Sequence, residues 1–233
     1  MFSKDYEFRY GDLDSERGIK LSTVMDLLQD AAIDHASVSG LDSDFLQTKS
    51  IAFLLDGWRI KFLKHLNPKM KATVKTGIVR VRKCETLRIF EILQDGERVA
   101  SVTSMWFAVN MEKRSIARLT EDFYSGFECI TEEDNGLEYT NLRPLKETEY
   151  CGSYKVAKRD TDSNKHMNNV KSVEFMLDYL PDGFNLSELQ VKYRKELLPD
   201  EDIKVYSKET DNGFYIEIRN SEDKPCVLLN AIE

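Results

Sequence analysis

The chain contains an internal repeat, and this repeat limits the possible folds of its 233 residues more than any other feature. Residues 11–14, Gly-Asp-Leu-Asp, align with residues 159–162, Arg-Asp-Thr-Asp, at an offset of 148. Residues 62–68 align with residues 193–199 at an offset of 131. Because the offset falls from 148 to 131, the first copy has the longer helix and loop. The sequence therefore predicts two domains with the same architecture.

Each copy is predicted to consist of a strand, an amphipathic helix and then an antiparallel meander. The first helix runs from about Ser22 to a stop at Gly40. The second runs from Asn169 to Leu180, where Pro181 ends it. Both segments carry apolar residues at helical spacing, so each helix has an apolar face that must be covered.

Antiparallel strands are predicted after each helix, in segments rich in Val, Ile, Thr and aromatic residues. They lie at residues 72–82, 86–93 and 98–109 in the first copy, and at residues 202–209, 214–219 and 226–232 in the second. Residues 94–97 and 211–213 supply hairpin turns. A curved antiparallel sheet wrapped around the helix would cover its apolar face. This is the hot-dog arrangement, and we predict an α+β chain with two tandem hot-dog domains.

The domain limits follow from the repeat. Residues 1–120 are predicted as the N-terminal domain and residues 147–233 as the C-terminal domain. Residues 121–146 join them, and this segment is rich in Asp and Glu with little periodicity. We expect it to be a solvated linker.

Composition excludes several classes of protein. A formal net charge of -8 argues against a nucleic-acid binder, which would usually carry a basic surface. The apolar runs are far shorter than the roughly 18 residues of a membrane span, and no signal peptide is visible, so we expect a soluble, cytoplasmic protein. The four cysteines are widely scattered, so we expect them to be reduced and structural rather than metal ligands or disulfides.

A polar motif directly precedes the second helix. Asp162, Asn164 and His166 alternate along the chain, so an extended backbone would point all three side chains the same way. Asn168 or Asn169 can cap the helix, whose first amides favour an oxygen that carries negative charge. This combination suits the addition of water to an acyl compound. The alternative is an Asx-rich turn with His166 exposed, which the residue types alone favour.

Several segments resemble the fatty acyl-ACP thioesterases over nearly the whole chain. The more specific ones are residues 162–170, Asp-Ser-Asn-Lys-His-Met-Asn-Asn-Val, and residues 193–196, Tyr-Arg-Lys-Glu. The first half adds residues 27–35, 39–41 and 104–106, with Asn110. The resemblance implies two fused hot-dog domains and hydrolysis of fatty acyl-acyl carrier protein, which releases the free fatty acid and ends chain elongation.

The resemblance also implies which residues act. Asp162, Asn164, His166 and Glu196 match the catalytic network of that family. Many plant members have a cysteine directly after the glutamate, whereas this chain has Leu197, so a thiolate mechanism is impossible at that position. Carboxylate-assisted attack remains.

The first copy has lost this polar set. It has Asp14, Glu16 and Gly18 at the matching positions, and His65 opposite Glu196. The resemblance suggests that the first domain holds the acyl chain. The residues that we predict to line its pocket are Met25, Trp58, Phe62 and Trp106, and for each of them a place in the ordinary core is the alternative.

The predicted partner is acyl carrier protein with its phosphopantetheine-linked acyl chain. We expect no cofactor and no metal, because the three histidines have no ligand-like spacing. An acyl-CoA thioesterase and a non-catalytic acyl-binding hot-dog protein are the alternatives. A structural homodimer module is a third, although the duplicated domain removes the need for one, and homodimer formation stays open.

Overall fold

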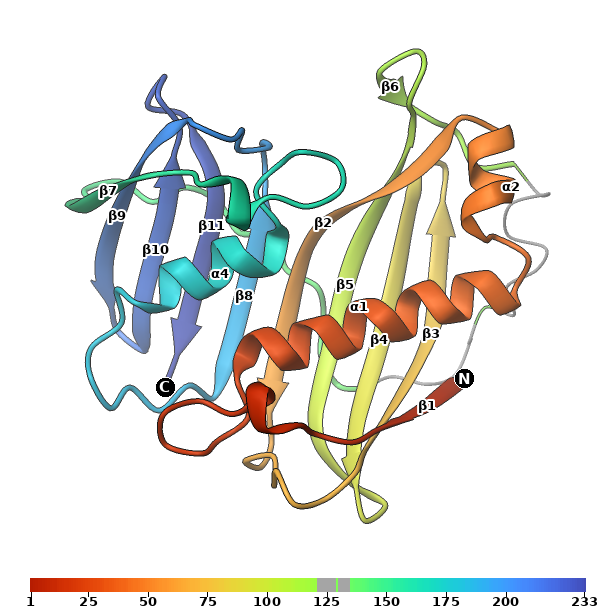
Figure 1. Ribbon diagram of the computed structural model, residues 1–233, viewed down its shortest axis with the longest axis horizontal. Helices are drawn as coiled ribbons and strands as arrows, with labels where there is room; N and C mark the ends of the chain where they lie inside the picture. Colours follow the sequence, from red (N-terminus) through yellow and green to blue (C-terminus); the bar gives the residue numbers. More distant parts are fainter. Residues whose placement is uncertain (121–128, 130–134) are drawn as a thin grey trace. The chain divides into compact units, whose positions relative to one another are not determined.

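The computed structural model describes residues 1–120, 129 and 135–233, which form two compact units (Figure 1). Unit 1 consists of Met1–Asp56 and Ile60–Tyr139, and unit 2 of Gly57–Arg59 and Thr140–Glu233. Most of the acidic residues on which the linker prediction rests lie outside the described residues. The domain limits predicted from the repeat stay a prediction.

Unit 1 is an antiparallel sheet with a long helix on one face. In chain order its elements are β1 (Phe2–Tyr6), α1 (Leu21–Val38), α2 (Ser43–Thr48), β2 (Ile51–Phe62), β3 (Ala72–Arg82), β4 (Glu85–Gln94), β5 (Glu97–Asn110) and β6 (Ser115–Ile116). The strand order is β1-β3-β4-β5-β2, and β6 pairs with β5. Figure 1 shows α1 lying across this sheet, and its buried residues include Met25 and Leu28.

The local signals in unit 1 act as the sequence predicts. The helix ends at Val38, and Gly40 follows with a φ of 79°, a left-handed conformation that glycine adopts without strain. Asp95 and Gly96 take φ values of 51° and 77°, which are typical of the tight turn between two twisted strands. The predicted strand at residues 72–82 is confirmed as β3.

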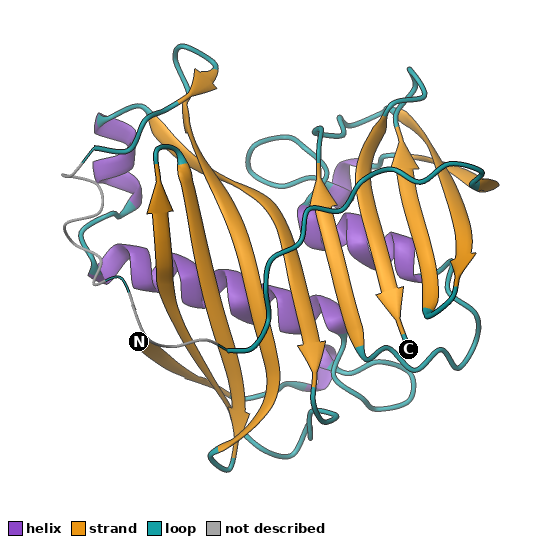
Figure 2. Cartoon of the chain, turned by 180° about the vertical axis from the view of Figure 1, so that it is seen from behind, coloured by secondary structure: helices purple, strands orange, loops and turns teal. Residues whose placement is uncertain are grey.

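Unit 2 repeats the plan with a shorter helix. Its elements are β7 (Glu149–Lys155), α4 (Asn169–Leu177), β8 (Glu188–Tyr193), β9 (Asp202–Thr210), β10 (Gly213–Arg219) and β11 (Pro225–Ile232). The strand order is β8-β11-β10-β9-β7. Figure 2 shows α4 on one face of these strands. The buried side of α4 includes Val173 and Met176, and the facing core includes Ile216 and Ile218.

These two units confirm the predicted fold class, because each is an antiparallel sheet with a helix packed on one face, α1 in unit 1 and α4 in unit 2. The second helix is shorter than predicted and ends at Leu177 instead of Leu180. Tyr179 and Leu180 donate their backbone N–H groups three residues back, so a tight turn replaces the last helical turn before Pro181. Among the described residues, no helix is long and apolar enough to cross a membrane.

Most of the described residues of the predicted linker are exposed, and the solvated linker stays a prediction. Asn135 and Leu137 are buried, and the Asn135 side chain donates to the carbonyl oxygens of Phe90 and Val102 in unit 1. The bonds of Asn135 satisfy backbone carbonyl groups of β4 and β5, so the segment contacts the sheet at this point, although most of its described residues are exposed.

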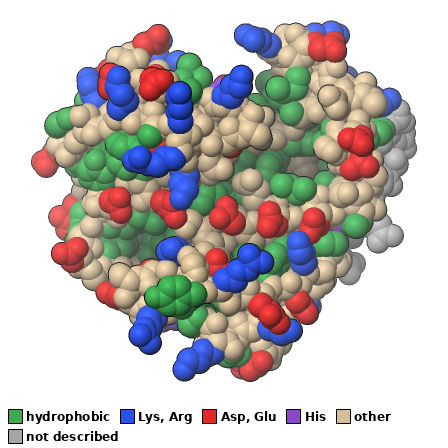
Figure 3. All heavy atoms as spheres, in the orientation of Figure 1, with side chains coloured by type: hydrophobic (Ala, Val, Ile, Leu, Met, Phe, Trp, Pro, Cys, Tyr) green, Lys and Arg blue, Asp and Glu red, His purple; other side chains and the backbone are tan. Residues whose placement is uncertain are grey.

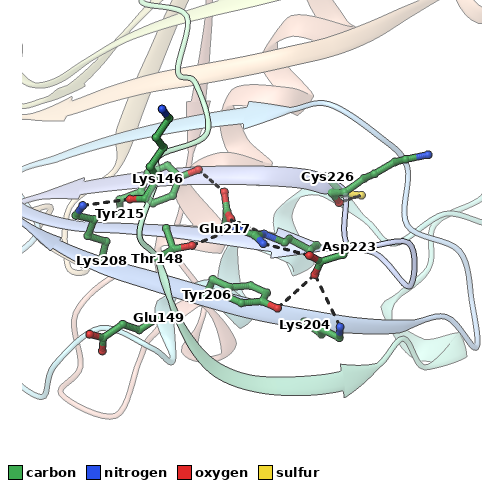
Figure 4. A network of polar contacts seen from close by, with 12 residues as sticks. Lys146, Thr148, Glu149, Lys204, Tyr206, Lys208, Tyr215, Glu217, Asp223 and Cys226 are labelled. Carbon is green, nitrogen blue, oxygen red and sulfur yellow. Dashed lines mark hydrogen bonds and ion pairs between the residues drawn. The ribbon is translucent and has the colours of Figure 1, made fainter.

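A polar network lies where residues 146–149 pass β9 and β10 (Figure 4). Glu217 is fully buried and accepts hydrogen bonds from the hydroxyl of Tyr215 and from Nε of Arg219, each over 2.6 Å. The guanidinium of Arg219 also stacks on the ring of Tyr206. A buried carboxylate needs such charged and hydrogen-bonding neighbours to offset its lost hydration.

The cysteines differ from one another more than the sequence indicates. Cys226 is buried, whereas Cys129 and Cys151 are exposed, and the expectation that all four are structural stays a prediction. All four are free thiols. Burial raises the pKa of the Cys226 thiol to about 11.

Candidate active site

The motif before α4 is a tight loop. The backbone N–H of Asp162 donates to the carbonyl oxygen of His166 over 2.9 Å, and Lys165 takes a φ of 65°. Oδ1 of Asp162 accepts from the amide of Asn164 over 2.8 Å and from that of His166 over 3.4 Å. The prediction of an extended backbone is therefore wrong, because the carboxylate captures the amides that follow it and curls the chain.

Asn168 is the N-cap of α4. Its Oδ1 atom accepts from the amides of Val170 and Lys171, over 2.8 and 3.2 Å. The amide of Asn168 donates to the carbonyl oxygen of Asp160. The amides of Asn168, Val170 and Lys171 are therefore already bonded, although the sequence alone suggests that they could bind an oxyanion. Within the described part of the chain, the amide of Asn169 has no hydrogen-bond acceptor, and it is the first amide of the helix.

His166 and Glu196 are in contact. Nε2 of His166 lies 3.2 Å from Oε2 of Glu196, and their side chains are 30% and 59% exposed. The backbone makes this contact possible, because the amide of Met167 donates to the carbonyl oxygen of Leu197 over 2.8 Å. Met167 and Leu197 are both buried, which anchors the two segments next to the paired side chains.

Asp162 and Asn164, the other two predicted catalytic residues, differ in burial and in their contacts. Asp162 is partly buried and contacts Asn164 and His166 through their backbone amides. Asn164 is exposed at the tip of the loop. The side chains of His166 and Glu196 therefore contact each other, whereas the Asp162 carboxylate bonds to backbone amides of its own loop.

The corresponding loop of unit 1 has the same conformation. The amide of Asp14 donates to the carbonyl oxygen of Gly18, Oδ1 of Asp14 accepts from the amides of Glu16 and Gly18, and Arg17 takes a φ of 66°. A Cβ at Gly18 would lie 2.9 Å from Oδ2 of Asp14, so a side chain fits there only if the carboxylate gives way. His166 occupies this position in unit 2, where the matching amide bond is longer.

The residues predicted to line an acyl pocket lie at different depths. Met25 on α1 and Trp58 on β2 are buried, whereas Phe62 and Trp106 are partly buried. The indole N–H of Trp106 donates to the hydroxyl of Ser104 over 2.8 Å. Their role in binding the acyl chain stays a prediction.

Sequence reasoning missed a buried cationic side chain in unit 1. Arg88 on β4 donates to Nδ1 of His35 over 2.8 Å and to Oγ1 of Thr76 over 3.2 Å. Burial lowers the pKa of Arg88 to about 9, and burial together with the charge of Arg88 lowers the pKa of His35 to about 4. The signal was present in the sequence, because Arg88 alternates with Phe90 on the buried face of a strand.

Both halves of the chain match known sequence families. Residues 1–127 match the acyl-ACP thioesterase N-terminal domain, and residues 144–230 match the acyl-ACP thioesterase C-terminal domain. Among the described residues, no group of three or more His, Cys, Asp or Glu side chains is placed to hold a metal ion.

Individual relatives are distant in sequence. A chloroplastic palmitoyl-acyl carrier protein thioesterase of Arabidopsis thaliana is 23% identical over 84% of this chain and 52% of its own length. The oleoyl-acyl carrier protein thioesterase 2 of the same plant is 24% identical over 82% and 59%. The chain thus spans about half the length of the curated relatives that it matches.

Solved structures agree closely in fold. An acyl-ACP thioesterase from Bacteroides thetaiotaomicron superposes with a TM-score of 0.90 at 19% identity, and covers 99% of this chain and 96% of its own. The 12:0-ACP thioesterase of Umbellularia californica gives 0.85 at 16% identity, with coverage of 99% and 96%. From the match of both domain families, the chain belongs to the acyl-ACP thioesterase family.

Proposed function

We propose that this chain hydrolyses the thioester of fatty acyl-acyl carrier protein, releases the free fatty acid and so ends chain elongation. The contact between His166 and Glu196 at the start of α4 carries this proposal, together with the family of both domains. A carboxylate paired with an imidazole can take a proton from water and return one to a leaving group.

In the proposed reaction the thioester carbonyl lies near the start of α4. The side-chain amide of Asn164 and the backbone amide of Asn169 would hold the carbonyl oxygen as it gains negative charge. The Asn169 amide suits this role because neighbouring amides are already bonded.

Glu196 would take a proton from water while the water oxygen adds to the thioester carbon. Collapse of the tetrahedral intermediate breaks the carbon–sulfur bond, and His166 orients Glu196 and supplies a proton to the departing thiolate. Direct attack by Glu196, which gives a transient anhydride that water then cleaves, is the alternative course. Asp162 would react with neither the water nor the thioester carbon, since its carboxylate holds the loop together.

The division of labour between the domains is also part of the proposal. Residues 147–233 carry the four catalytic residues, and residues 1–120 hold the acyl chain, with residues 121–146 between them. Met25, Trp58, Phe62 and Trp106 would line the pocket in the N-terminal part. Burial of about ten methylenes contributes on the order of 8 kcal/mol before any cost is subtracted, so this pocket would dominate affinity.

Comparison of acyl-ACP with acyl-CoA tests the choice of carrier. We expect faster turnover of acyl-ACP, with a rate advantage that shrinks as salt screens the charges between two proteins. Figure 3 shows charged side chains of both signs at the surface, so a salt series is needed to detect the contribution of charge. Higher kcat/KM on acyl-CoA at every salt concentration would favour an acyl-CoA thioesterase.

The non-catalytic alternative makes a different prediction. An acyl-binding protein would bind acyl-ACP but would release no free fatty acid. A homodimer and a cytoplasmic location are further parts of the proposal, and light scattering of the purified chain tests the first of them.

A further inference from the structure

We propose that Tyr193 is a positioning residue for the pair of His166 and Glu196, an inference that rests on the proposed function. Tyr193 is the last residue of β8, and its hydroxyl donates to the carbonyl oxygen of Asn169 over 3.2 Å. Asn169 is the first residue of α4. The bond therefore joins the strand that leads to Glu196 to the helix that follows His166.

Two hydrogen bonds tie these segments together. One is the Tyr193 bond, and the other is the backbone bond from Met167 to Leu197 over 2.8 Å. Along residues 193–197, Glu196 lies between the two tethered residues. The amides of Arg194 and Lys195 donate to the carbonyl oxygen of Cys226, so the strand side of this junction is fixed on β11. Without the Tyr193 bond, the start of α4 and the loop that carries His166 can shift against this strand, and the imidazole then leaves its 3.2 Å contact with the carboxylate.

The phenol of Tyr193 is a suitable tether. Burial raises its pKa above the ordinary value, so the hydroxyl stays a donor throughout the pH range of an enzyme assay. The carbonyl oxygen of Asn169, which accepts this bond, is also held in place, because the hydroxyl of Ser172 donates to it over 2.7 Å.

The first copy of the repeat supplies an internal comparison. At the offset of 131, Phe62 takes the place of Tyr193. The corresponding loop of unit 1, residues 14–18, has the same conformation although unit 1 lacks the phenol hydroxyl. Unit 1 has Gly18 where unit 2 has His166. The hydroxyl is thus found in the copy that has the imidazole and the glutamate. Phenylalanine at this junction is compatible with the fold, so Tyr193→Phe is expected to fold.

The experiment measures kcat and KM of the full chain on one acyl-ACP for wild type, Tyr193→Phe, Glu196→Gln and the double variant. Tyr206→Phe is the matched control, since its hydroxyl donates to Asp223 over 3.3 Å in the network of Figure 4. We expect Tyr193→Phe to lower kcat about tenfold with KM nearly unchanged. In the Glu196→Gln background the same change should have little effect, because two residues that act as a unit are not additive.

Amide hydrogen exchange provides a readout that needs no substrate. Exchange of the Met167 amide should become faster in Tyr193→Phe and stay at the wild-type rate in Tyr206→Phe. Failure of wild type to hydrolyse acyl-ACP would count against the proposed function, whereas the exchange rate tests the tether separately. The inference is overturned by wild-type kcat in Tyr193→Phe, by an equal loss in both backgrounds, by unchanged exchange, or by a variant that does not fold.

Discussion

Nε2 of His166 lies 3.2 Å from Oε2 of Glu196, and both side chains remain accessible to solvent. The two residues come from separate segments, which the backbone bond between Met167 and Leu197 holds together. A thioester that reaches the start of α4 would therefore meet a carboxylate, an imidazole and the amide of Asn169.

Replacement of Asp162 should act through the loop. Asp162→Ala removes the acceptor of two amide bonds, so we expect a loss of about 1–2 kcal/mol in the free energy of unfolding and a large loss of turnover. Asp14→Ala is the matched variant, because Asp14 makes the same bonds in unit 1. It should cost similar stability with turnover retained. Denaturant unfolding and steady-state rates measure both effects, and equal loss of turnover in the two variants would refute this role.

The carboxylates of Asp162 and Glu196 should differ in function. Asp162→Asn keeps an amide oxygen that can accept the same backbone bonds, so we expect a modest loss of turnover. Glu196→Gln removes a base, for which the typical loss is about 10² to 10⁴. A pH–rate profile of each variant accompanies the comparison. Near-normal turnover of Glu196→Gln, with a folded but inactive Asp162→Asn, would reverse the two roles.

Acid should destabilise the protein through His35. Its pKa of about 4 in the folded chain lies below the ordinary value of 6.5, so between these pH values the unfolded chain binds the proton and the folded chain does not. The free energy of unfolding should therefore be fully retained above pH 6.5 and should fall as pH drops toward 4. His35→Gln should flatten this slope relative to the exposed control His65→Gln. Urea unfolding across the range tests it, and parallel slopes in the two variants would contradict it.

No cysteine should be needed for turnover. Leu197 follows Glu196, and burial holds the pKa of Cys226 at about 11, which keeps that thiol protonated. A thiol reagent should label the exposed Cys129 and Cys151 in the native protein and leave Cys226 unlabelled. Activity should persist in a variant with all four cysteines replaced and in the presence of chelator. Loss of turnover on replacing Cys151 alone, in a protein that folds, would disprove this expectation.

The sequence predicts those parts of the fold that depend on local signals. The stop at Gly40, the turn at Asp95 and Gly96, and the limits of β3 all follow from residue type and periodicity. β2 is not among the predicted strands, and Asp56 and Gly57 lie in the middle of it although this dipeptide is typical of a turn. Pairing with neighbouring strands overrides that local preference.

The site was less predictable than the fold. Alternation of polar residues could not reveal that Asp162 bonds the amides that follow it, because an Asx turn and an extended strand accept the same residues. Glu196 reads as a surface charge beside Arg194 and Lys195 until the resemblance to a family identifies it. Its contact with His166 depends on pairing between distant segments, which one sequence does not show.

The most direct test of this account is incubation of the purified chain with a panel of acyl-ACPs of different chain lengths, with free fatty acid quantified by mass spectrometry. We predict that wild type releases fatty acid and free carrier thiol in equal amounts, and that Glu196→Gln releases them at least about a hundredfold more slowly. Glu209→Gln, which changes an exposed carboxylate in the same unit, should match wild type. A folded wild-type chain that releases no fatty acid from any acyl-ACP, or a Glu196→Gln variant as fast as wild type, would contradict the account.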